Sequence, residues 1–267
     1  MAPRSSHSLR CCPCGRRLGL LGTRAAALLR LRPSKASGAG PSDPEAIMER
    51  FHPRRPDWYQ ELYAKVLKKC MRSYEAKVAA YKAKLFSQLT GKSKKILELG
   101  VGTGANFKYY ASAVDINVIG VDPNKKMEKY AQAAAVAAGL PLTNFSFMQG
   151  VGESLPVGDD TMDAVIGTLV LCSVTDIDMA LKEIKRVLKP GGLFLFIEHV
   201  AAHDGSLLRC MQSILDPLQQ FVSDGCHLTR ETGKLISEAG FSSVDLNMTV
   251  LSSLSLIGPH VYGIACK

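Results

Sequence analysis

A glycine-rich turn near the middle of the chain has the residue types to hold a nucleotide-like ligand. Gly100, Gly102 and Gly104 alternate directly behind a predicted strand over residues 95–99. Missing side chains at such a turn let a ligand approach the backbone closely. Because Gly100-x-Gly102-x-x-Ala105 also satisfies a dinucleotide fingerprint, the glycines alone leave the class of ligand open.

The acid that precedes the first glycine by two residues distinguishes between two ligand classes. Glu98 would repel a pyrophosphate, which is anionic, and would attract the cationic amino and sulfonium groups of S-adenosylmethionine. The sequence therefore favours S-adenosylmethionine as the cofactor. Asn106, which follows the last glycine by two residues, belongs to the same predicted site.

A second carboxylate, Asp122, ends the next predicted strand, 24 positions after Glu98. At that spacing a carboxylate can accept hydrogen bonds from both hydroxyls of a ribose. NAD enzymes share this feature, so it indicates an adenosine without identifying the donor. The alternative role for Asp122 is the N-cap of a helix that begins at Pro123. Both residues are included in the predicted cofactor site.

Further elements follow the glycine turn in a fixed order. A loop with Gly152 and Glu153 comes after the third predicted strand, Asp163 leads into the fourth, and a Pro-Gly-Gly turn over 190–192 precedes the fifth. In this order and spacing the elements resemble class I S-adenosylmethionine-dependent methyltransferases with a type 11 methyltransferase domain. That superfamily includes the ubiquinone and menaquinone C-methyltransferases.

The closer resemblance is to the methyltransferase-like seven group, known as alkyl thiol S-methyltransferases. It covers the chain from about residue 95 to the C-terminus and rests on the runs 102–108, 168–174, 198–202, 224–230 and 259–263. The last three runs lie outside the generic cofactor motifs and are specific to the group. The resemblance implies methyl transfer from S-adenosylmethionine to a small apolar thiol.

Two features depart from the pattern of the relatives. Many members of the superfamily place an acid at the position of Val151 to bind the adenine amino group, so Gly152 and Glu153 are the nearest candidates here. Members of the group begin with a hydrophobic membrane-associating segment, whereas this chain begins with a basic one. Cellular location therefore does not follow from the resemblance.

The acceptor of such an enzyme approaches over the carboxyl ends of the fourth and fifth strands. Thr168 and Leu169 follow the fourth strand and complete the predicted cofactor site, and His199 ends the fifth. His199 is the favoured catalytic residue, as a general base or as a group that orients the acceptor. His227 is the alternative, and a purely structural role stays open for both histidines.

The cysteines are assigned no chemistry. Cys172 and Cys226 are expected to pack as small apolar residues, because methyl transfer needs no covalent enzyme intermediate. No pair of cysteines has the spacing of zinc ligands, so no metal site is predicted.

The formal net charge of +9 lies almost entirely in the first 40 residues. That segment holds eight basic side chains and no acidic one, which leaves 25 basic and 24 acidic residues in the remainder. The body of the chain is nearly neutral. Its composition therefore gives no reason to expect a nucleic acid as a partner.

The basic segment has the composition of an organelle transit peptide, with leucines and arginines alternating over residues 17–31. A disordered basic tail is the alternative. We expect a transit peptide and linker over 1–45, with the mitochondrion as the preferred destination and the chloroplast as the alternative. No apolar run reaches the roughly 20 residues of a membrane-spanning helix, so at most a peripheral membrane contact is expected.

The elements that must position these residues alternate between strands and helices, which is typical of a parallel sheet. Prolines and glycines mark residues 33–56 as a linker, and one or two amphipathic helices over 58–89 dominate a helical segment, 46–92. The methyltransferase domain is placed at 93–267. The predicted fold class is α/β, a doubly wound, seven-stranded, mostly parallel sheet with an N-terminal helical extension. The expected strands are 95–99, 117–121, 145–149, 162–167, 193–198, 244–250 and 261–266, and the expected helices are 105–111, 124–138, 176–188, 205–221 and 229–239.

Three functions remain open at this point. The favoured one is S-methylation of a small apolar thiol, in a pocket that the helix over 203–222 and the N-terminal helix could roof; simple core packing is the alternative for that helix. The second is C- or O-methylation of a quinone-like or phenolic lipid. The third is a non-catalytic protein that binds adenosine or NAD. The sequence does not fix the oligomeric state.

Overall fold

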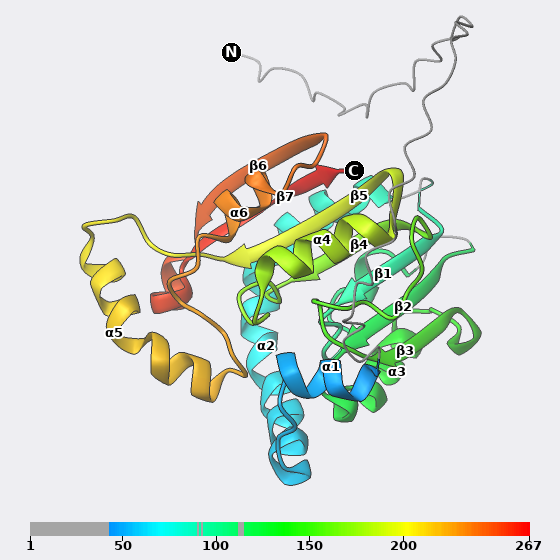
Figure 1. Cartoon of the computed structure of the whole chain (residues 1–267), viewed down its shortest axis with the longest axis horizontal. Helices are drawn as coiled ribbons and strands as arrows, with labels where there is room; N and C mark the ends of the chain where they lie inside the picture. Colours follow the sequence, from blue (N-terminus) through cyan, green and yellow to red (C-terminus); the bar gives the residue numbers. More distant parts are fainter. Residues whose placement is uncertain (1–42, 90, 92, 112–114) are drawn as a thin grey trace, which may run out of the picture. The chain divides into compact units, whose positions relative to one another are not determined.

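The computed structural model describes residues 43–89, 91, 93–111 and 115–267, so the expected transit peptide lies outside the described residues except for its last positions. In the described part of the chain, seven strands form one sheet in the order β3-β2-β1-β4-β5-β7-β6 (Figure 1). The strands are β1 (Lys95–Leu99), β2 (Asn117–Asp122), β3 (Phe145–Gln149), β4 (Met162–Thr168), β5 (Leu188–His199), β6 (Ser243–Val250) and β7 (Pro259–Cys266).

The sheet is wound in two directions from its middle. Strands β1 to β5 pair in parallel, and β7 enters antiparallel between β5 and β6. The chain runs outward from β1 to β3 on one side and outward from β4 on the other, so the order reverses between β1 and β4. Ligands of such sheets bind beyond the carboxyl ends of the strands at this reversal. The predicted fold class is confirmed.

Helices cover both faces of the sheet. Apolar side chains of α4 and α6 join one core, while the end of α2 and α3 join the other. Successive residues of β1 point to opposite faces, as the pleat of a strand requires, so Leu97 belongs to the first core and Ile96 to the second. The α-helices are α1 (Pro44–Phe51), α2 (Asp57–Phe86), α3 (Glu128–Ala137), α4 (Ile177–Val187), α5 (Leu207–Val222) and α6 (Thr232–Glu238), and the short 3-10 turns are η1 (Ser87–Leu89), η2 (Phe107–Tyr109), η3 (Lys125–Met127), η4 (Leu142–Asn144) and η5 (Ser252–Ile257).

The N-terminal extension begins earlier than the sequence indicates. Asp43 caps α1 by accepting a hydrogen bond from the backbone N–H of Glu45, and Pro44 occupies the first helical position. The interpretation of 33–56 as a linker is therefore wrong for α1. Helix α2 is a single helix of 30 residues, not two. Its first half leaves Trp58 68% exposed, and its second half packs into the core.

Three predicted helices are clearly shorter than expected, and the one over 124–138 is divided into η3 and α3. The stretch 105–111 forms only the 3-10 turn η2, because Gly104 at φ 75° turns the chain away from a regular helical start. The helix predicted over 229–239 is α6, which spans seven residues. The strands differ from prediction at their ends, most of all β5, which begins at Leu188 instead of residue 193.

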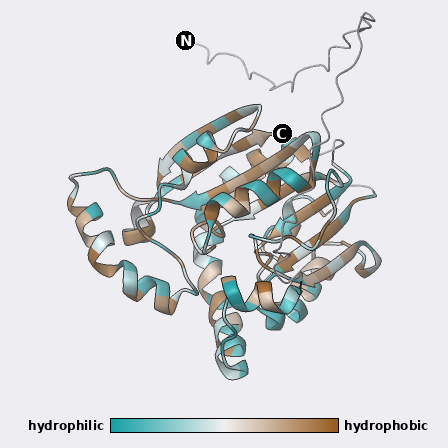
Figure 2. Ribbon diagram, in the orientation of Figure 1, coloured by the Kyte–Doolittle hydropathy of each residue, from teal (hydrophilic) through white to brown (hydrophobic). Residues whose placement is uncertain are grey.

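Helix α5 is amphipathic, yet its apolar side faces solvent. Leu207, Ile214 and Phe221 are 78%, 70% and 66% exposed, and Gln212 is the one buried residue of the helix. Figure 1 shows α5 apart from the sheet, and Figure 2 shows hydrophobic residues distributed along it. Core packing of this helix is therefore excluded. Within the described residues, no helix combines the length and the apolar composition that crossing a membrane would require.

Candidate functional site

A cavity of about 680 Å³ lies beyond the carboxyl ends of β1, β2, β4 and β5. Its volume is in the range of sites for small molecules and cofactors. The end residues Leu99, Asp122, Thr168 and His199 of these strands all line it, and α2 lines it from outside the sheet. The predicted residues that line the cavity are Glu98, Gly100, Gly102, Asn106, Asp122, Pro123, Gly152, Glu153, Thr168, Leu169 and His199.

The glycine turn needs its glycines for different reasons. Gly100, Gly102 and Gly104 all have positive φ angles, of 63°, 51° and 75°. A Cβ atom on Gly100 would lie 2.7 Å from Val170 Cγ2, and one on Gly104 would lie 2.8 Å from Ala134 Cβ. A Cβ atom on Gly102 would have ordinary contacts, so this glycine leaves space on the cavity side. Gly104 is not among the described residues that line the cavity. It lies on the side of the turn that packs against Ala134 and Phe107.

Glu98 is buried at the edge of the cavity with two polar partners. Asn106 Nδ2 donates to Glu98 Oε1 at 2.8 Å, and the Tyr110 hydroxyl donates to Oε2. Burial raises the pKa of Glu98 to about 7, and the two hydrogen bonds act in the opposite direction. The carbonyl oxygen of the Asn106 side chain, Oδ1, is buried and has no hydrogen-bond partner among the described residues. A ligand with a hydrogen-bond donor fits that position.

Asp122 holds the glycine turn as well as facing the cavity. Its Oδ2 accepts from the backbone N–H of Gly102 at 2.9 Å, and its Oδ1 accepts from that of Asn124 at 2.9 Å. Burial raises its pKa to about 6 against these hydrogen bonds. The N-cap role falls to Asn124, whose Oδ1 accepts from Lys126 N ahead of η3. The expected contact of Asp122 with a ribose stays a prediction.

Gly152 and Glu153 lie where a ligand attached to the glycine turn could reach them, but Glu153 has a structural task. Its Oε1 accepts from the backbone N–H of Thr175 at 2.6 Å and from that of Asp176 at 3.0 Å, just before α4. Gly152 has no positive φ, and a Cβ atom there would lie 3.1 Å from Val174 Cγ1. The assignment of the adenine contact to these residues is not tested by the structure.

The residues after β4 adopt an unusual backbone. Leu169 has a φ of 53°, which is uncommon for a branched side chain and typical of functional sites. Thr168 Oγ1 accepts from Asn106 Nδ2 at 3.2 Å, which links the end of β4 to the glycine turn. Glu198, to which the sequence assigned no role, holds the following loop by accepting from the backbone N–H groups of Val170 and Leu171 at 3.0 and 3.1 Å.

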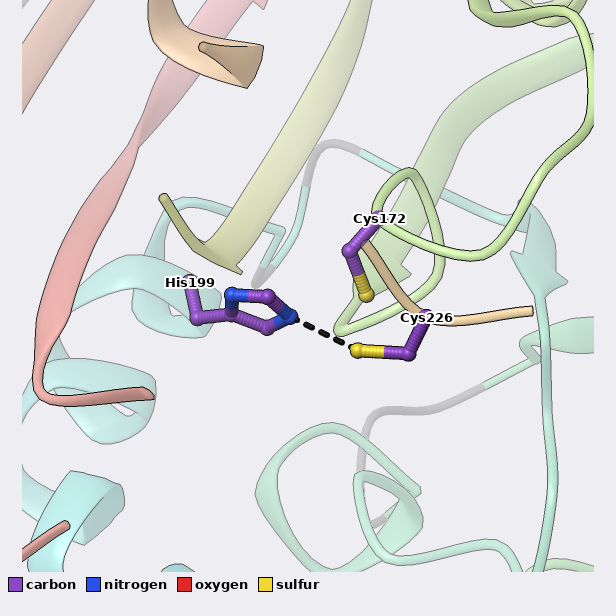
Figure 3. Close-up of side chains that lie close together, drawn as sticks. All are labelled: Cys172, His199 and Cys226. Atoms are coloured by element: carbon purple, nitrogen blue, oxygen red, sulfur yellow. Dashed lines mark hydrogen bonds between the residues drawn. The ribbon is translucent and has the colours of Figure 1, made fainter. Parts of the chain in front are cut away.

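His199 stands at the end of β5 beside two cysteines, as Figure 3 shows. Its Nε2 lies 2.9 Å from Cys226 Sγ, and its Nδ1 is buried without a partner among the described residues. The Sγ atoms of Cys172 and Cys226 and a ring nitrogen of His199, which are atoms that can bind a metal ion, all lie within 4.8 Å of one another. A hydrogen bond from Cys172 lowers the pKa of Cys226, and His199 acts in the same direction against burial. Cys172 and Cys226 are buried as the sequence predicts, and the fold also brings them together beside His199.

The structure separates the two candidate histidines. His227 is not among the described residues that line the cavity. Its Nδ1 lies 3.5 Å from Asp216 Oδ2 on α5, and its backbone N–H donates to the Cys172 carbonyl at 2.9 Å. These contacts suit a structural role for His227 in the loop that carries Cys226, whereas His199 lines the cavity.

Side chains from the N-terminal extension also reach the site, and sequence reasoning missed them. Lys82 of α2 is 1% exposed, pairs with Glu75 and lines the cavity. His52, just after α1, forms an ion pair with Asp224 at 3.0 Å. The partners lie seven and 172 positions apart, and only the spacing of Glu75 and Lys82, which places both on one face of a helix, offered a sequence signal.

Comparison with known proteins identifies the family of the chain. Residues 97–196 match the methyltransferase domain family. The chain is 41% identical over 201 residues to thiol S-methyltransferase TMT1A of Homo sapiens, covering 73% of this chain and 81% of the relative. It is 42% identical over 203 residues to thiol S-methyltransferase TMT1B of Rattus norvegicus, covering 73% and 82%. The ubiquinone/menaquinone C-methyltransferase UbiE of Haemophilus ducreyi matches over 109 residues at 36% identity, or 40% of this chain and 42% of that protein.

Solved structures share the fold at low identity. A S-adenosylmethionine-dependent methyltransferase of Thermotoga maritima superimposes with a TM-score of 0.55 at 22% identity, over 78% of this chain and 99% of that one. The [4+2]-cyclase SpnF superimposes with a TM-score of 0.54 at 20% identity, over 69% and 79%. Because one fold carries both activities, these matches bear on architecture alone.

The sequence relatives decide the family, since their identity extends over more than four fifths of the relatives and well beyond the methyltransferase domain. The same relationship implies S-adenosylmethionine as the methyl donor. The chain belongs to the family of the thiol S-methyltransferases TMT1A and TMT1B and is a class I S-adenosylmethionine-dependent methyltransferase.

Proposed function

We propose that the cavity binds S-adenosylmethionine at the glycine turn and that the protein transfers the methyl group to a small apolar thiol. The observation that carries this proposal is that one cavity contains two buried carboxylates beside the turn and the His199–Cys226 pair at the end of β5. The thiol S-methyltransferase relatives support the choice of acceptor. When bound, the cofactor supplies a methyl group on a cationic sulfur.

The residues present fit such a cofactor. Glu98 and Asp122 provide negative charge beside the turn, and Gly102 leaves room for close approach to the backbone. Asn106 Oδ1 is a buried acceptor without a partner in the described residues, as a site for a ligand N–H requires. Pro123, Gly152, Glu153, Thr168 and Leu169 complete the proposed cofactor site.

The acceptor part of the cavity is mostly apolar. Tyr63 and Met71 of α2 line the cavity, together with Leu254 and Ile257 of η5. Side chains of this kind hold an apolar molecule by burial and exclude water from the reacting atoms. In the proposed reaction His199 orients the acceptor or takes its proton. A free thiol, with a pKa near 8.5, is only partly ionised at neutral pH, so such help raises the reactive fraction.

Calorimetry tests the donor assignment. We expect S-adenosylhomocysteine to bind and NADH not to bind, because a diphosphate would meet the carboxylates of Glu98 and Asp122. Tight binding of NADH without binding of S-adenosylhomocysteine would instead support a non-catalytic NAD-binding protein.

Turnover with different acceptors tests the thiol assignment. The full chain is offered labelled donor with an alkyl or aryl thiol, or with a demethylated quinone or a phenol. We expect methylation of the thiol, because the relatives that match most of the chain are named for that activity, whereas UbiE matches 40% of it. Turnover of a quinone or phenol without any turnover of thiols would replace this proposal with lipid C- or O-methylation.

We further propose a peripheral membrane contact through α5. Its exposed face carries Leu207, Ile214 and Phe221, an arrangement typical of helices that lie in a membrane interface. Replacing these three residues with serine should reduce co-sedimentation with lipid vesicles. Val136→Ser on α3, also an exposed apolar position, should leave it unchanged. Equal sedimentation of all variants would contradict the proposal.

We propose a mitochondrial location on the sequence of residues 1–45 alone. A fluorescent fusion of the full chain should colocalise with mitochondria, and removal of that segment should abolish the pattern. Colocalisation with chloroplasts would select the alternative destination, and an unchanged pattern after removal would contradict a transit peptide.

A further inference from the structure

The geometry points to a zinc site formed by Cys172, His199 and Cys226, in which the fourth zinc position takes the sulfur of the acceptor thiol. This inference rests on the proposed thiol acceptor. It assigns the cluster a metal and gives His199 the role of a ligand in place of a proton acceptor.

The three side chains converge from separate parts of the fold. Cys172 comes from the loop after β4, His199 from the end of β5, and Cys226 from the loop after α5 (Figure 3). They are 1%, 2% and 7% exposed, and their ligand-type atoms lie within 4.8 Å of one another. All three line the cavity. A metal bound between them would therefore face the space where the acceptor binds.

The donor set selects the class of metal. Two thiolates and an imidazole are ligands of zinc, whereas Mg²⁺ and Ca²⁺ require oxygen. Three protein ligands leave one tetrahedral position open, as in zinc sites that act on a substrate. Zn–S and Zn–N bonds at the tetrahedral angle separate nitrogen from sulfur by about 3.6 Å. His199 Nε2 and Cys226 Sγ, now 2.9 Å apart, need to separate by only about 0.7 Å.

The surroundings hold the ligands in place. Glu198 accepts from the backbone N–H groups of Val170, Leu171 and Cys172, and the Cys172 carbonyl accepts from His227 N. The backbone N–H and the carbonyl of Cys172 are thus both held by hydrogen bonds that do not involve its thiol. Arg230 donates from Nη1 to the carbonyls of Leu171 and Val174, at 2.6 and 2.7 Å, and so places a positive charge near the loop. That charge offsets part of the negative charge of three sulfur ligands.

The open position would activate the acceptor. A thiol that coordinates zinc loses its proton, which leaves to solvent, and the Zn–S bond takes its place. The thiolate sulfur then forms a bond to the donor methyl carbon. The bond from that carbon to the donor sulfur breaks, and its electron pair stays on the donor sulfur, which becomes a neutral thioether. The methylated product is also a neutral thioether and a weaker zinc ligand than the thiolate, so it can leave.

Metal analysis of the purified full chain tests the site without reference to activity. We expect about one zinc ion per chain, and its loss in Cys172→Ser and Cys226→Ser. Cys210→Ser should retain zinc, because Cys210 is exposed and lies outside the cavity lining within the described residues. Wild-type chain without zinc that also fails to bind added Zn²⁺ or Co²⁺ would overturn the proposal, as would zinc retained in both cluster variants.

Cobalt substitution tests the open position. Addition of benzyl thiol to the Co²⁺ form, with no methyl donor present, should change the visible absorption bands of the metal, because the thiolate enters its coordination sphere. A spectrum that does not respond to thiol would show a closed structural site and overturn the substrate role. If zinc binds and the spectrum responds while thiols are never methylated, the metal site stands and the proposed function fails, so the two failures are distinguishable.

Discussion

Burial gives the two carboxylates beside the glycine turn their chemical character. Glu98 is 1% exposed and Asp122 is 7% exposed, and burial raises their pKa values to about 7 and about 6. A buried carboxylate loses the solvation of its charge, and a cationic ligand replaces part of what is lost. The site should therefore prefer a cationic ligand and should bind it best when both acids are ionised.

Donor affinity should follow the ionisation of Glu98. Between pH 6 and pH 8 the ionised fraction of a group with a pKa of about 7 rises roughly tenfold, and the affinity for S-adenosylmethionine should rise by about that factor. Calorimetry across this range measures the effect. Glu98→Gln should bind more weakly and should lose most of the pH dependence. A wild-type affinity that is constant between pH 6 and pH 8 would contradict the assignment.

The same residue should reduce the stability of the free protein at high pH. The pKa of Glu98 is raised in the folded chain above its usual 4.5, so the folded state binds a proton more tightly than the unfolded state. This contribution to stability is fully present below about pH 4.5 and is lost as the pH rises through about 7. Glu98→Gln should therefore flatten the fall in melting temperature over this interval.

Asp122→Ala should weaken donor binding at least about tenfold, because it removes two expected hydrogen bonds to the ribose, worth roughly 1.5–3 kcal/mol each at most. It also frees the Gly102 N–H that Asp122 holds at 2.9 Å. Equilibrium binding of S-adenosylhomocysteine measures the loss. Asp178→Ala, an exposed acid at the start of α4, is the matched control. Unchanged affinity in Asp122→Ala would reduce Asp122 to a structural role.

Residue types close together in the sequence could be predicted, and residues brought together by the fold could not. The glycine turn and Glu98 lie within seven positions, so their juxtaposition follows from one strand and one turn. Cys172, His199 and Cys226 follow one another at intervals of 27 positions and come from three parts of the fold whose packing no local pattern reveals. His199 was predicted at the cavity, but its cysteine neighbours were not.

At the scale of elements, the N-terminal helices form a cover that closes one side of the cavity. Phe51, which ends α1, and His52, which follows it, line the cavity, and α2 contributes residues from Tyr63 to Lys82. Two contacts fasten the end of α1: His52 Nε2 lies 3.0 Å from Asp224 Oδ2, and the Thr175 hydroxyl donates to the Phe51 carbonyl at 2.7 Å. Although burial opposes it, the Asp224 carboxylate raises the pKa of His52.

Asp224→Asn should loosen this cover, because it removes the charge that pairs with His52. We expect the KM for donor or acceptor to rise about threefold to tenfold, which corresponds to on the order of 1 kcal/mol for a partly buried pair. Hydrogen exchange at residues 44–52 should also become faster. Arg54→Ala, which removes an exposed ion pair with Asp57, serves as the control. Equal hydrogen exchange in the two variants would show that the contact between His52 and Asp224 does not stabilise residues 44–52.

The order of strands and helices could be predicted because hydrophobic runs and turn residues are local. The failures have local causes too. Pro44 looked like a linker residue, but it occupies the first position of α1. The helix predicted over 105–111 is replaced by η2, which follows Gly104 at a φ of 75°, and its apolar residues Phe107 and Tyr110 join the core. The solvent-facing apolar side of α5 could not be foreseen, because amphipathicity does not say what covers it.

For the whole molecule, the two ends of the cavity come from the two halves of the sheet. The proposed donor site is centred on β1 and β2 and reaches the end of β4, and the proposed acceptor site lies at β5 and at the loops after β4 and α5. Antiparallel β7 pairs with β5 up to His199, whose register partner is His260. That pairing supports His199 from the outer side of the sheet.

Removal of residues 1–42 should leave donor affinity and thiol methylation within about twofold of the full chain, because the described residues that line the cavity run from Phe51 to Ile257. Activity assays and calorimetry on the shortened chain measure this. Removal of residues 1–56, which also takes away α1 and His52, should weaken both. Equal loss in both shortened chains would contradict the assignment of the cover to α1.

The central claim is that this cavity transfers a methyl group from a cationic donor to sulfur. A single-turnover reaction of the full chain with methyl-labelled S-adenosylmethionine and a small aryl thiol, analysed by mass spectrometry, tests it directly. We predict that the label appears in the methyl thioether in an amount equal to the S-adenosylhomocysteine formed. Label that stays on the donor while the bound thiol remains unmodified would contradict the account.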